Sequence, residues 1–341
     1  MAPPRSVRFP FPPAGLEVRE AVPADNDALI ALELESPLEL GDIELAFDRT
    51  PDFFGRHRLH PGCRIVVGAL EGRLVGVLAS VIHSAPVAGT RRLLQYIHQG
   101  RVHRAVQRRG VASALSARLL LWGRERGVDS AYWLISETNI PSMSFGGRGG
   151  GLWPVPARFH DYDTRGVAAA PAMSLPPDSL SEAVELINDT HRGQELFEPF
   201  TVDSFATRLD LNPQYGRGHL RCAMEDGRVV AVAGLWDEGR TAKEIRRDRS
   251  TGDTRVTSAA AVLDWGWAPG HEAAFAGLLR SLAAEARSWG RDTLIVSAPA
   301  AGALPDAGLP LRAWELQIFM PGVQPPAARD VRGVFVDLAR F

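Results

Sequence analysis

The sequence predicts a mixed α/β fold built of two tandem domains, each with a partly antiparallel central sheet flanked by helices. The chain has 341 residues, about twice the length of a typical domain. The order strand, hairpin, strand, helix, strand also occurs twice, at a spacing of about 160 residues. A local string also recurs: Trp122-Gly123-Arg124 ends one helical run, and Trp289-Gly290-Arg291 ends the other. A duplicated domain accounts for both observations.

The elements of the first half follow from residue periodicity, turn residues and helix-stop signals. Residues 16–22 alternate as a strand, 23–35 have helical spacing after a proline, and a second helix is expected over part of 48–58. Residues 64–82 predict a hairpin turning at 71–73, and 91–103 another strand. A helix over 111–127 then ends at Gly127, and 130–136 form a short buried strand.

The second half repeats this order, with a hairpin over 220–236, a strand over 262–270, a helix over 272–290 and a strand over 292–298. Residues 239–255 lack periodicity and are expected to form a polar excursion. The join falls in the proline- and alanine-rich segment 168–180. We therefore expect a flexible proline-rich tail over 1–14, an N-terminal domain over 15–170 and a C-terminal domain over 171–341.

Composition argues against a strongly charged nucleic-acid-binding protein, a disulfide-rich protein and a membrane-spanning protein. The net charge is only −2, so no global field points to nucleic acid or membrane. Cys63 and Cys222 are the two cysteines, which form neither a disulfide framework nor a metal cluster. No apolar run is long enough to cross a membrane, and the N-terminus lacks the apolar core of a signal peptide. We expect a cytoplasmic protein without a membrane partner, as a monomer or a homodimer.

The string QRRGVA, residues 107–112, lies between a strand and a helix. A helix start has backbone amides without partners and the positive end of the helix dipole, and both favour phosphate. Gly110 permits close approach and unusual dihedral angles, while Gln107, Arg108 and Arg109 can add side-chain contacts. The alternative is a helix N-terminus that only contacts water.

This context resembles the GNAT superfamily of acyl-CoA-dependent N-acyltransferases over roughly residues 15–165. The strand ending at Val102-His103, the string QRRGVA, the next helix and a strand followed by Asn139 carry the resemblance. The family pattern N-x-x-A-x-x-L-Y-x-K-x-G-F is matched in part by NIPSMSFGGRGGGLW. Its N, A, L, K and G positions are occupied by Asn139, Ser142, Phe145, Arg148 and Gly150. Tandem GNAT domains are known in the family.

The resemblance implies that an acyl-CoA, in the first place acetyl-CoA, is the co-substrate, that its pantetheine pairs with the strand ending at Val102, and that no metal is needed. The residues implied in contact with it are Val102, Gln107, Arg108, Arg109, Gly110, Val111, Ala112, Ser113, Asn139 and Ser142.

For the catalytic groups, we expect His98 to take the proton of the amine, directly or through water, with Tyr96 on the same face of the strand. A histidine with a purely structural role is the alternative. His83 and His103 are weaker candidates. The general acid common in the family is a tyrosine seven residues after the asparagine, where this chain has Gly146; Tyr132 and Tyr162 are the replacements considered.

The acceptor loop implied by the family is the segment 36–49, whose Glu39, Asp42, Glu44 and Asp48 could attract a cationic amine or simply be solvated. In the second half the equivalent of QRRGVA lies in 268–277, where Glu272 brings negative charge to the phosphate position. We therefore expect the second half to have lost CoA binding.

The resulting hypothesis is an N-acyltransferase, in the first place an N-acetyltransferase, with one site in the N-terminal half and a small-molecule amine as acceptor. Two alternatives remain. One keeps the fold but takes the acyl group from an aminoacyl-tRNA or an acyl carrier protein, the only reading that brings in nucleic acid, through Arg101, Arg104, Arg108, Arg109 and the arginines of 246–249. The other is a non-catalytic acyl-CoA-binding regulatory module.

Overall fold

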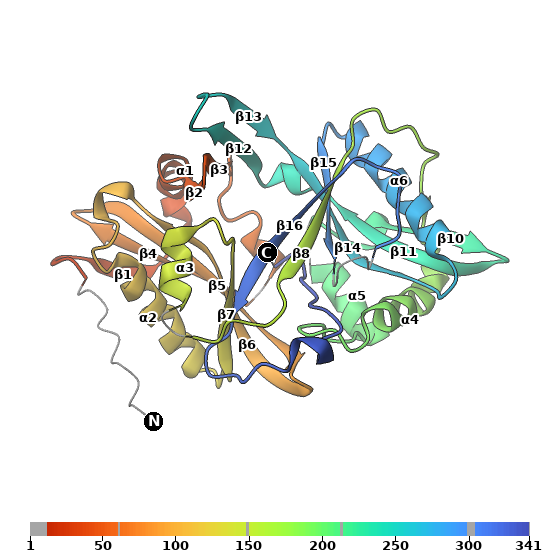
Figure 1. The fold of residues 1–341 in the computed structure, drawn as a ribbon, viewed down its shortest axis with the longest axis horizontal. Helices are drawn as coiled ribbons and strands as arrows, with labels where there is room; N and C mark the ends of the chain where they lie inside the picture. The colour runs from red at the N-terminus through yellow and green to blue at the C-terminus, as the bar shows by residue number, and fades with distance from the viewer. Residues whose placement is uncertain (1–11, 61, 148–149, 212–213, 299–303, 341) are drawn as a thin grey trace.

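A single large sheet runs through both halves of the molecule (Figure 1). The computed structural model describes residues 12–340 except 61, 148–149, 212–213 and 299–303. Within these ranges the large sheet has twelve strands, in the order β1-β4-β5-β6-β7-β16-β8-β15-β14-β11-β10-β9. Most of the expected tail, and Arg148 of the motif after Asn139, lie outside the described residues.

The strands of this sheet are β1 (Glu17–Glu20), β4 (Cys63–Leu70), β5 (Arg73–Val87), β6 (Thr90–Val102), β7 (Ser130–Ile135), β8 (Ala157–Asp163), β9 (Met173–Ser174), β10 (Leu220–Glu225), β11 (Arg228–Trp236), β14 (Ala259–Trp267), β15 (Thr293–Ala298) and β16 (Leu311–Phe319). The α-helices are α1 (Asn26–Glu35), α2 (Val111–Arg124), α3 (Ile140–Gly146), α4 (Leu180–His191), α5 (Val202–Leu211) and α6 (Glu272–Ser288).

The expected duplication is present in the topology. The series β4, β5, β6, α2, β7 of the first half corresponds to β10, β11, β14, α6, β15 of the second. In each series the last two strands are parallel and the others antiparallel. The mixed α/β class and the tandem arrangement predicted from the sequence are thus confirmed.

The two halves exchange their last strands in the middle of the sheet. β8, from the first half, pairs antiparallel with β15, so that Leu294 lies opposite Tyr162. β16, from the second half, pairs antiparallel with β7, so that Ile318 lies opposite Leu134. β8 and β16 also pair with each other. The boundary expected near residue 170 stays a prediction, and strand pairing crosses it.

A second sheet joins the halves again, and it corrects two expectations from the sequence. Among the described residues its strands are β2 (Leu38–Leu40), β3 (Ile43–Asp48), β12 (Lys243–Asp248) and β13 (Thr254–Thr257), in the order β13-β12-β3-β2. The acceptor loop expected over 36–49 therefore contains a hairpin, and so does the polar excursion over 239–255. Ile43, Leu45 and Phe47 alternate with more polar residues in β3, whose edge β12 completes from the other half.

The prediction of a second helix over part of 48–58 is also wrong. This segment consists of turns followed by a 3₁₀ helix, His57–Leu59. The Asp48 side chain accepts a hydrogen bond from the Thr50 N–H at 2.9 Å, and the Asp52 side chain accepts one from the Phe54 N–H at 3.0 Å. Such local bonds stabilise turns at the expense of helix.

Helices cover both faces of the large sheet (Figure 1). In the first half α1 packs on one face through Leu29 and Leu32, and α2 on the other through Leu115 and Leu119. In the second half α6 covers one face, and α4 with α5 covers the other. Within the described part of the chain, no helix has the length and apolar character of a membrane span.

Candidate functional site

An opening separates β6 from β7 on the C-terminal side of their pairing. Only three residue pairs join the two parallel strands, the last being Tyr96 with Tyr132. β6 then continues to Val102 and β7 to Ile135 without pairing to each other. The backbone of β6 beyond Tyr96 is therefore an unpaired edge, to which an extended ligand can add as a further strand. This is the strand with which, by the family resemblance, the pantetheine is expected to pair.

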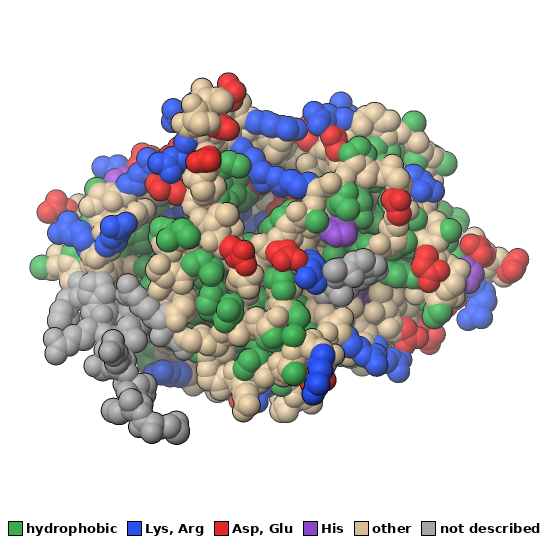
Figure 2. Space-filling view, in the orientation of Figure 1, with side chains coloured by type: hydrophobic (Ala, Val, Ile, Leu, Met, Phe, Trp, Pro, Cys, Tyr) green, Lys and Arg blue, Asp and Glu red, His purple; other side chains and the backbone are tan. Residues whose placement is uncertain are grey.

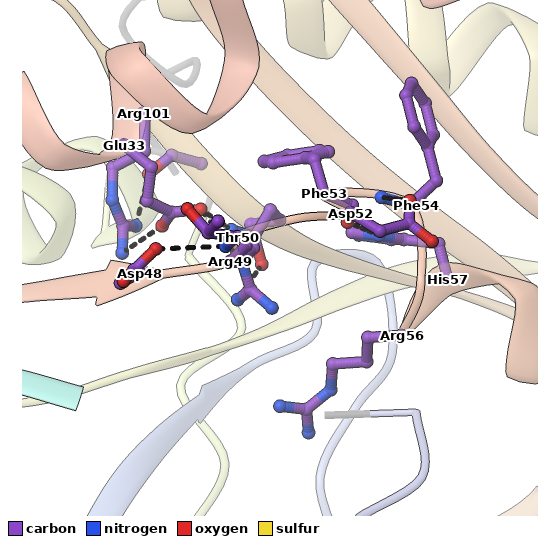
Figure 3. A network of polar contacts seen from close by, with 12 residues as sticks. Glu33, Asp48, Arg49, Thr50, Asp52, Phe53, Phe54, Arg56, His57 and Arg101 are labelled. Carbon is purple, nitrogen blue, oxygen red and sulfur yellow. Dashed lines mark hydrogen bonds and ion pairs between the residues drawn. The ribbon is translucent and has the colours of Figure 1, made fainter. Parts of the chain in front are cut away.

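A β-bulge shapes β6 beside this opening. Its register with β5 shifts between Val77 and Ala79, and Gln99 has a φ of +57°. The buried carboxylate of Glu33 holds the bulge, because it accepts a hydrogen bond from the Gln99 side chain and forms ion pairs with Arg49 at 3.0 Å and Arg101 at 2.9 Å. Figure 3 shows Glu33 directed toward both guanidinium groups. Bulges redirect backbone groups next to binding sites.

The loop after β6 presents backbone amides at the start of α2. Arg108 has a φ of +61°, and Gly110, the N-cap of α2, has a φ of +83°. The helical hydrogen bonds begin with the Ala114 N–H, which donates to the Gly110 carbonyl at 3.0 Å. The amides of Val111, Ala112 and Ser113 precede it and have no acceptor within the helix. The loop has the geometry of an anion site.

The side chains of this loop have different environments. Arg108 and Arg109 are exposed, and no ion pair within the described ranges includes either of them. Gln107 is exposed too, and its side-chain amide donates to the Val102 carbonyl at 3.2 Å. The Val111 side chain is buried in the core under α2, so only its backbone can face a ligand. Two free guanidinium groups therefore accompany the amides.

Asn139 and Ser142 lie at the start of α3. The Asn139 side-chain oxygen accepts a hydrogen bond from the Ser142 N–H at 3.2 Å, which makes Asn139 the N-cap of this helix. The structure thus gives Asn139 a local role, the orientation of α3 after β7. A contact of either residue with a cofactor stays a prediction.

Gly146 occupies a position without room for a side chain. A Cβ atom there would lie 2.6 Å from Nε1 of Trp133 and 2.8 Å from Cδ1 of Ile135. The indole of Trp133 therefore fills the space next to the position of the family tyrosine. This packing gives a physical reason for the departure from the family motif.

A column of stacked rings lies on the opposite face of β6 from α2. Its order is Phe53, His57, His98, Tyr96 and Tyr132, with centroid distances of 5.4, 5.6, 5.1 and 5.0 Å. The structure thus brings the two candidate catalytic residues, His98 and Tyr96, together. His57 was not foreseen, because it comes from the irregular segment after β3, and no sequence spacing links it to β6.

Burial controls the protonation of this column. It lowers the pKa of His98 well below its usual value, and the neighbouring His57 and Arg56 lower it further. Burial also lowers the pKa of His57 to about 3 and raises the pKa of both Tyr96 and Tyr132. The histidines are therefore neutral and the tyrosines protonated at neutral pH.

The weaker candidates for base and acid, two histidines and two tyrosines, differ in their position relative to the ring column. His83 Nε2 lies 2.9 Å from the Tyr132 hydroxyl, so these two residues form one polar pair at the end of the column. His103 caps the short 3₁₀ helix Arg104–Val106, outside the column. Tyr162 packs in the core beneath α6, in a different hydrophobic cluster from Tyr96 and Tyr132. Of the two replacement tyrosines, only Tyr132 lies near His98.

Three of the four acidic residues of 36–49 have side chains engaged with arginines or backbone. Glu44 pairs with Arg104 at 2.8 Å, and Glu39 lies 3.7 Å from Arg249. Asp48 accepts hydrogen bonds from Thr50, which lower its pKa. This pairing leaves less negative charge for an amine.

The second half lacks an open anion site at the matching position. Gly270 precedes α6 with a φ of +84°, but its N–H donates to the Glu272 carboxylate at 3.3 Å. The bulge is retained, because the register of β14 with β11 shifts between Val232 and Gly234 and Asp264 has a φ of +47°. Asp264 is buried and paired with Arg208 at 3.1 Å. At the loop before α6, the carboxylate of Glu272 thus accepts the hydrogen bond that a ligand anion would accept.

Comparisons with known proteins agree with this geometry. Residues 27–147 match the model of the acetyltransferase (GNAT) family. A search of curated proteins by sequence found no match. N-myristoyltransferase of Saccharomyces cerevisiae with bound myristoyl-CoA has a similar structure, with a TM-score of 0.64 and 13% identity over 96% of this chain and 91% of that one.

Two further solved structures are similar. A GCN5-related N-acetyltransferase from Sphaerobacter thermophilus gives a TM-score of 0.57 and 15% identity over 97% of this chain and 100% of that one. A fungal GCN5-related glucosamine N-acetyltransferase region gives 0.61 and 14% over 91% of this chain and 38% of that one. At these identities the likeness establishes the fold. Residues 27–147 thus match the acetyltransferase (GNAT) family, and the chain has a tandem GNAT fold along its length.

Proposed function

We propose that this chain is an N-acyltransferase that moves an acyl group, in the first place acetyl, from acyl-CoA to the amine of a small molecule, with one site in the N-terminal half. One observation carries the proposal. The unpaired edge of β6 leads directly into the loop whose amides and exposed arginines can hold a pyrophosphate. The same element thus provides a place for the extended and for the anionic part of the donor.

Different residues of the site take different steps of the proposed reaction. The amine nitrogen forms a bond to the thioester carbonyl carbon, the carbon–sulfur bond breaks, and the amine loses a proton. His98, neutral at neutral pH, accepts that proton through water. A backbone amide of β6 near the bulge donates to the carbonyl oxygen as it gains charge. Tyr132, protonated and next to His83, is the candidate donor of a proton to the leaving sulfur.

A cleft between the halves is the proposed acceptor site. Its volume is about 350 Å³, and its lining includes Phe47, Asp161, Glu238, Glu244 and Arg255. Glu238, in the lining of the cleft, pairs with Arg56, which adjoins His57 in the sequence, so one ion pair connects the cleft with the segment that carries His57. Its size is within the usual range of small-molecule sites.

A tRNA donor is disfavoured because several of the arginines named for it are paired, Arg108 and Arg109 excepted. Arg101 is buried against Glu33, Arg104 pairs with Glu44, and Arg246 pairs with Glu244. Acidic and basic side chains are interspersed on the face in Figure 2. Binding of RNA backbone needs a continuous basic surface.

Calorimetric titration of acetyl-CoA tests the proposal. The wild type should bind at about one site per chain, and Gly110→Asp should abolish binding, because it puts a charged side chain into the loop. Gly270→Asp is the matched control, since Gly270 has nearly the same φ and precedes the corresponding helix. Its binding should equal that of the wild type.

The donor panel should extend to myristoyl-CoA, the ligand of the yeast structure. Binding of no acyl-CoA by the wild type would overturn the proposal and favour a carrier-protein or tRNA donor. Binding without turnover across a panel of amines would favour the regulatory module.

A further inference from the structure

Three potential metal ligands from separate segments meet beside the ring column. His57 lies at the start of the 3₁₀ helix after β3, Cys63 opens β4, and His98 lies on β6. One ligand atom from each residue lies within 4.8 Å of the other two. Cys63 is a free thiol. The fold thus creates a cluster of two imidazoles and one thiol.

The hydrogen bonding of His57 directs a lone pair into the molecule. Its Nδ1 lies 3.2 Å from the Phe53 carbonyl oxygen, which can only accept, so Nδ1 carries the proton and Nε2 the lone pair. This Nε2 is buried and has no hydrogen-bond partner, and the side chain belongs to a residue only 6% exposed. Histidine ligands of metals commonly donate their other N–H to a backbone carbonyl in this way.

His98 has the same deficit. Its Nε2 is buried without a hydrogen-bond partner. Buried polar atoms without partners are rare, and each one needs an explanation such as an unseen water or ion. Two histidines with such a nitrogen, each with one ring nitrogen within 4.8 Å of the free thiol's sulfur, point to a shared ligand.

We propose that His57, Cys63 and His98 form a binding site for zinc or a similar borderline-soft divalent metal ion, with the fourth position open. Two nitrogens and a sulfur suit Zn²⁺ and do not suit Mg²⁺ or Ca²⁺. Ligand atoms in tetrahedral zinc sites are ~3.3–3.8 Å apart, as follows from Zn–N and Zn–S bonds of about 2.0–2.3 Å. A contraction of about 1 Å therefore closes the site.

The charges around the cluster oppose a cation only in part. Arg49 and Arg56 flank His57; Arg56 is paired with Glu238, whereas Arg49 shares the buried Glu33 carboxylate with Arg101. The thiol loses its proton when the metal–sulfur bond forms, so Zn²⁺ and the thiolate together add one positive charge and release one proton to solvent.

The metal would compete with proton transfer. Coordination occupies the lone pair of His98, so a loaded site should inhibit acyl transfer. This inhibition rests on the proposed function, whereas metal binding does not.

Titration of the metal-free, full-length protein with Co²⁺ and Zn²⁺ tests the site. We expect one metal per chain, and with Co²⁺ a thiolate-to-metal charge-transfer absorption. Cys63→Ser should abolish this absorption and weaken Zn²⁺ binding at least tenfold, while Cys222→Ser, which alters the other free cysteine, should change neither. Absence of the absorption in the wild type, or its persistence in Cys63→Ser, would overturn the site.

An activity assay then tests the inhibition. Zn²⁺ should inhibit the wild type, and a chelator should restore activity. Cys63→Ser should keep the basal rate and need at least tenfold more Zn²⁺ for inhibition. Metal binding without inhibition would support the site and contradict the role of His98, whereas absence of metal binding would leave the acyltransferase proposal intact.

Discussion

At the scale of single residues, the main question is whether His98 has a structural or a catalytic role. It stacks between His57 and Tyr96 at centroid distances of 5.6 and 5.1 Å, and burial keeps its ring neutral. A buried ring in a stack can be purely structural. A neutral imidazole beside an open strand edge can also accept a proton, and kinetics distinguish the two roles.

We expect His98→Gln to lower kcat by about 10²-fold with little change in KM, measured with a chelator present. The folded-state pKa of His98 is depressed, so the base is lost only when the pH falls through a value well below 6.5. The wild-type kcat/KM should therefore show no histidine step between pH 6 and 8. A step near pH 6.5 that disappears in the variant would contradict the depressed pKa of His98, and an unchanged kcat would contradict its role as the base.

The tight packing around Gly146 can be tested through its effect on the free energy of unfolding. Gly146→Ala places a methyl group against Trp133 and Ile135, so we expect the free energy of unfolding to fall by about 1–3 kcal/mol. Gly147→Ala is the control, because a Cβ there meets no atom within 4 Å and its φ is −64°. Urea unfolding measures both, and equal effects would show that the tight packing at Gly146 is not the cause.

The residues of the loop 107–113 could be predicted because they are contiguous and follow a strand. His57 and Cys63 could not, since their relation to His98 depends on how β4 and β6 flank β5. Glu33 was also missed. It lies within a predicted helix, and an acidic residue at one helical position gives no sign of burial until Arg49 and Arg101 are placed around it.

At the scale of elements, the Glu33 network connects α1, the segment after β3 and the bulge of β6. Glu33→Gln leaves two buried guanidinium groups without their carboxylate, so we expect a loss of about 3–5 kcal/mol in the free energy of unfolding. Glu35→Gln, which removes an exposed pair with Arg73 and a contact with His103 at 3.7 Å, should cost less than about 1 kcal/mol. Comparable losses in urea unfolding would contradict the network's importance.

The helices and hairpins with strong periodicity were predicted to within a few residues, as α2 and the hairpin β4–β5 show. The second sheet was not. β12, with the sequence KEIRRD, has no apolar face of its own, and it forms because β3 provides a partner from the other half. Pairing over such a sequence distance leaves no local pattern to find.

At the scale of the whole molecule, the exchange of β8 and β16 makes each half depend on the other. We expect residues 15–170 and 171–341, expressed separately, to unfold without a cooperative transition, and to recover the near-ultraviolet spectrum of the intact chain when expressed together. Each half alone lacks the strand that covers β7 or β15. Cooperative unfolding of either half alone would contradict this dependence.

The exchange also sets an order for biosynthesis. β7 leaves the ribosome with no strand on its outer edge, and it stays so until residues 311–319 have been made. At about 5–20 residues per second this interval lasts roughly ten to forty seconds. During that time the nascent chain carries an uncovered strand edge, and such an edge can pair with other chains.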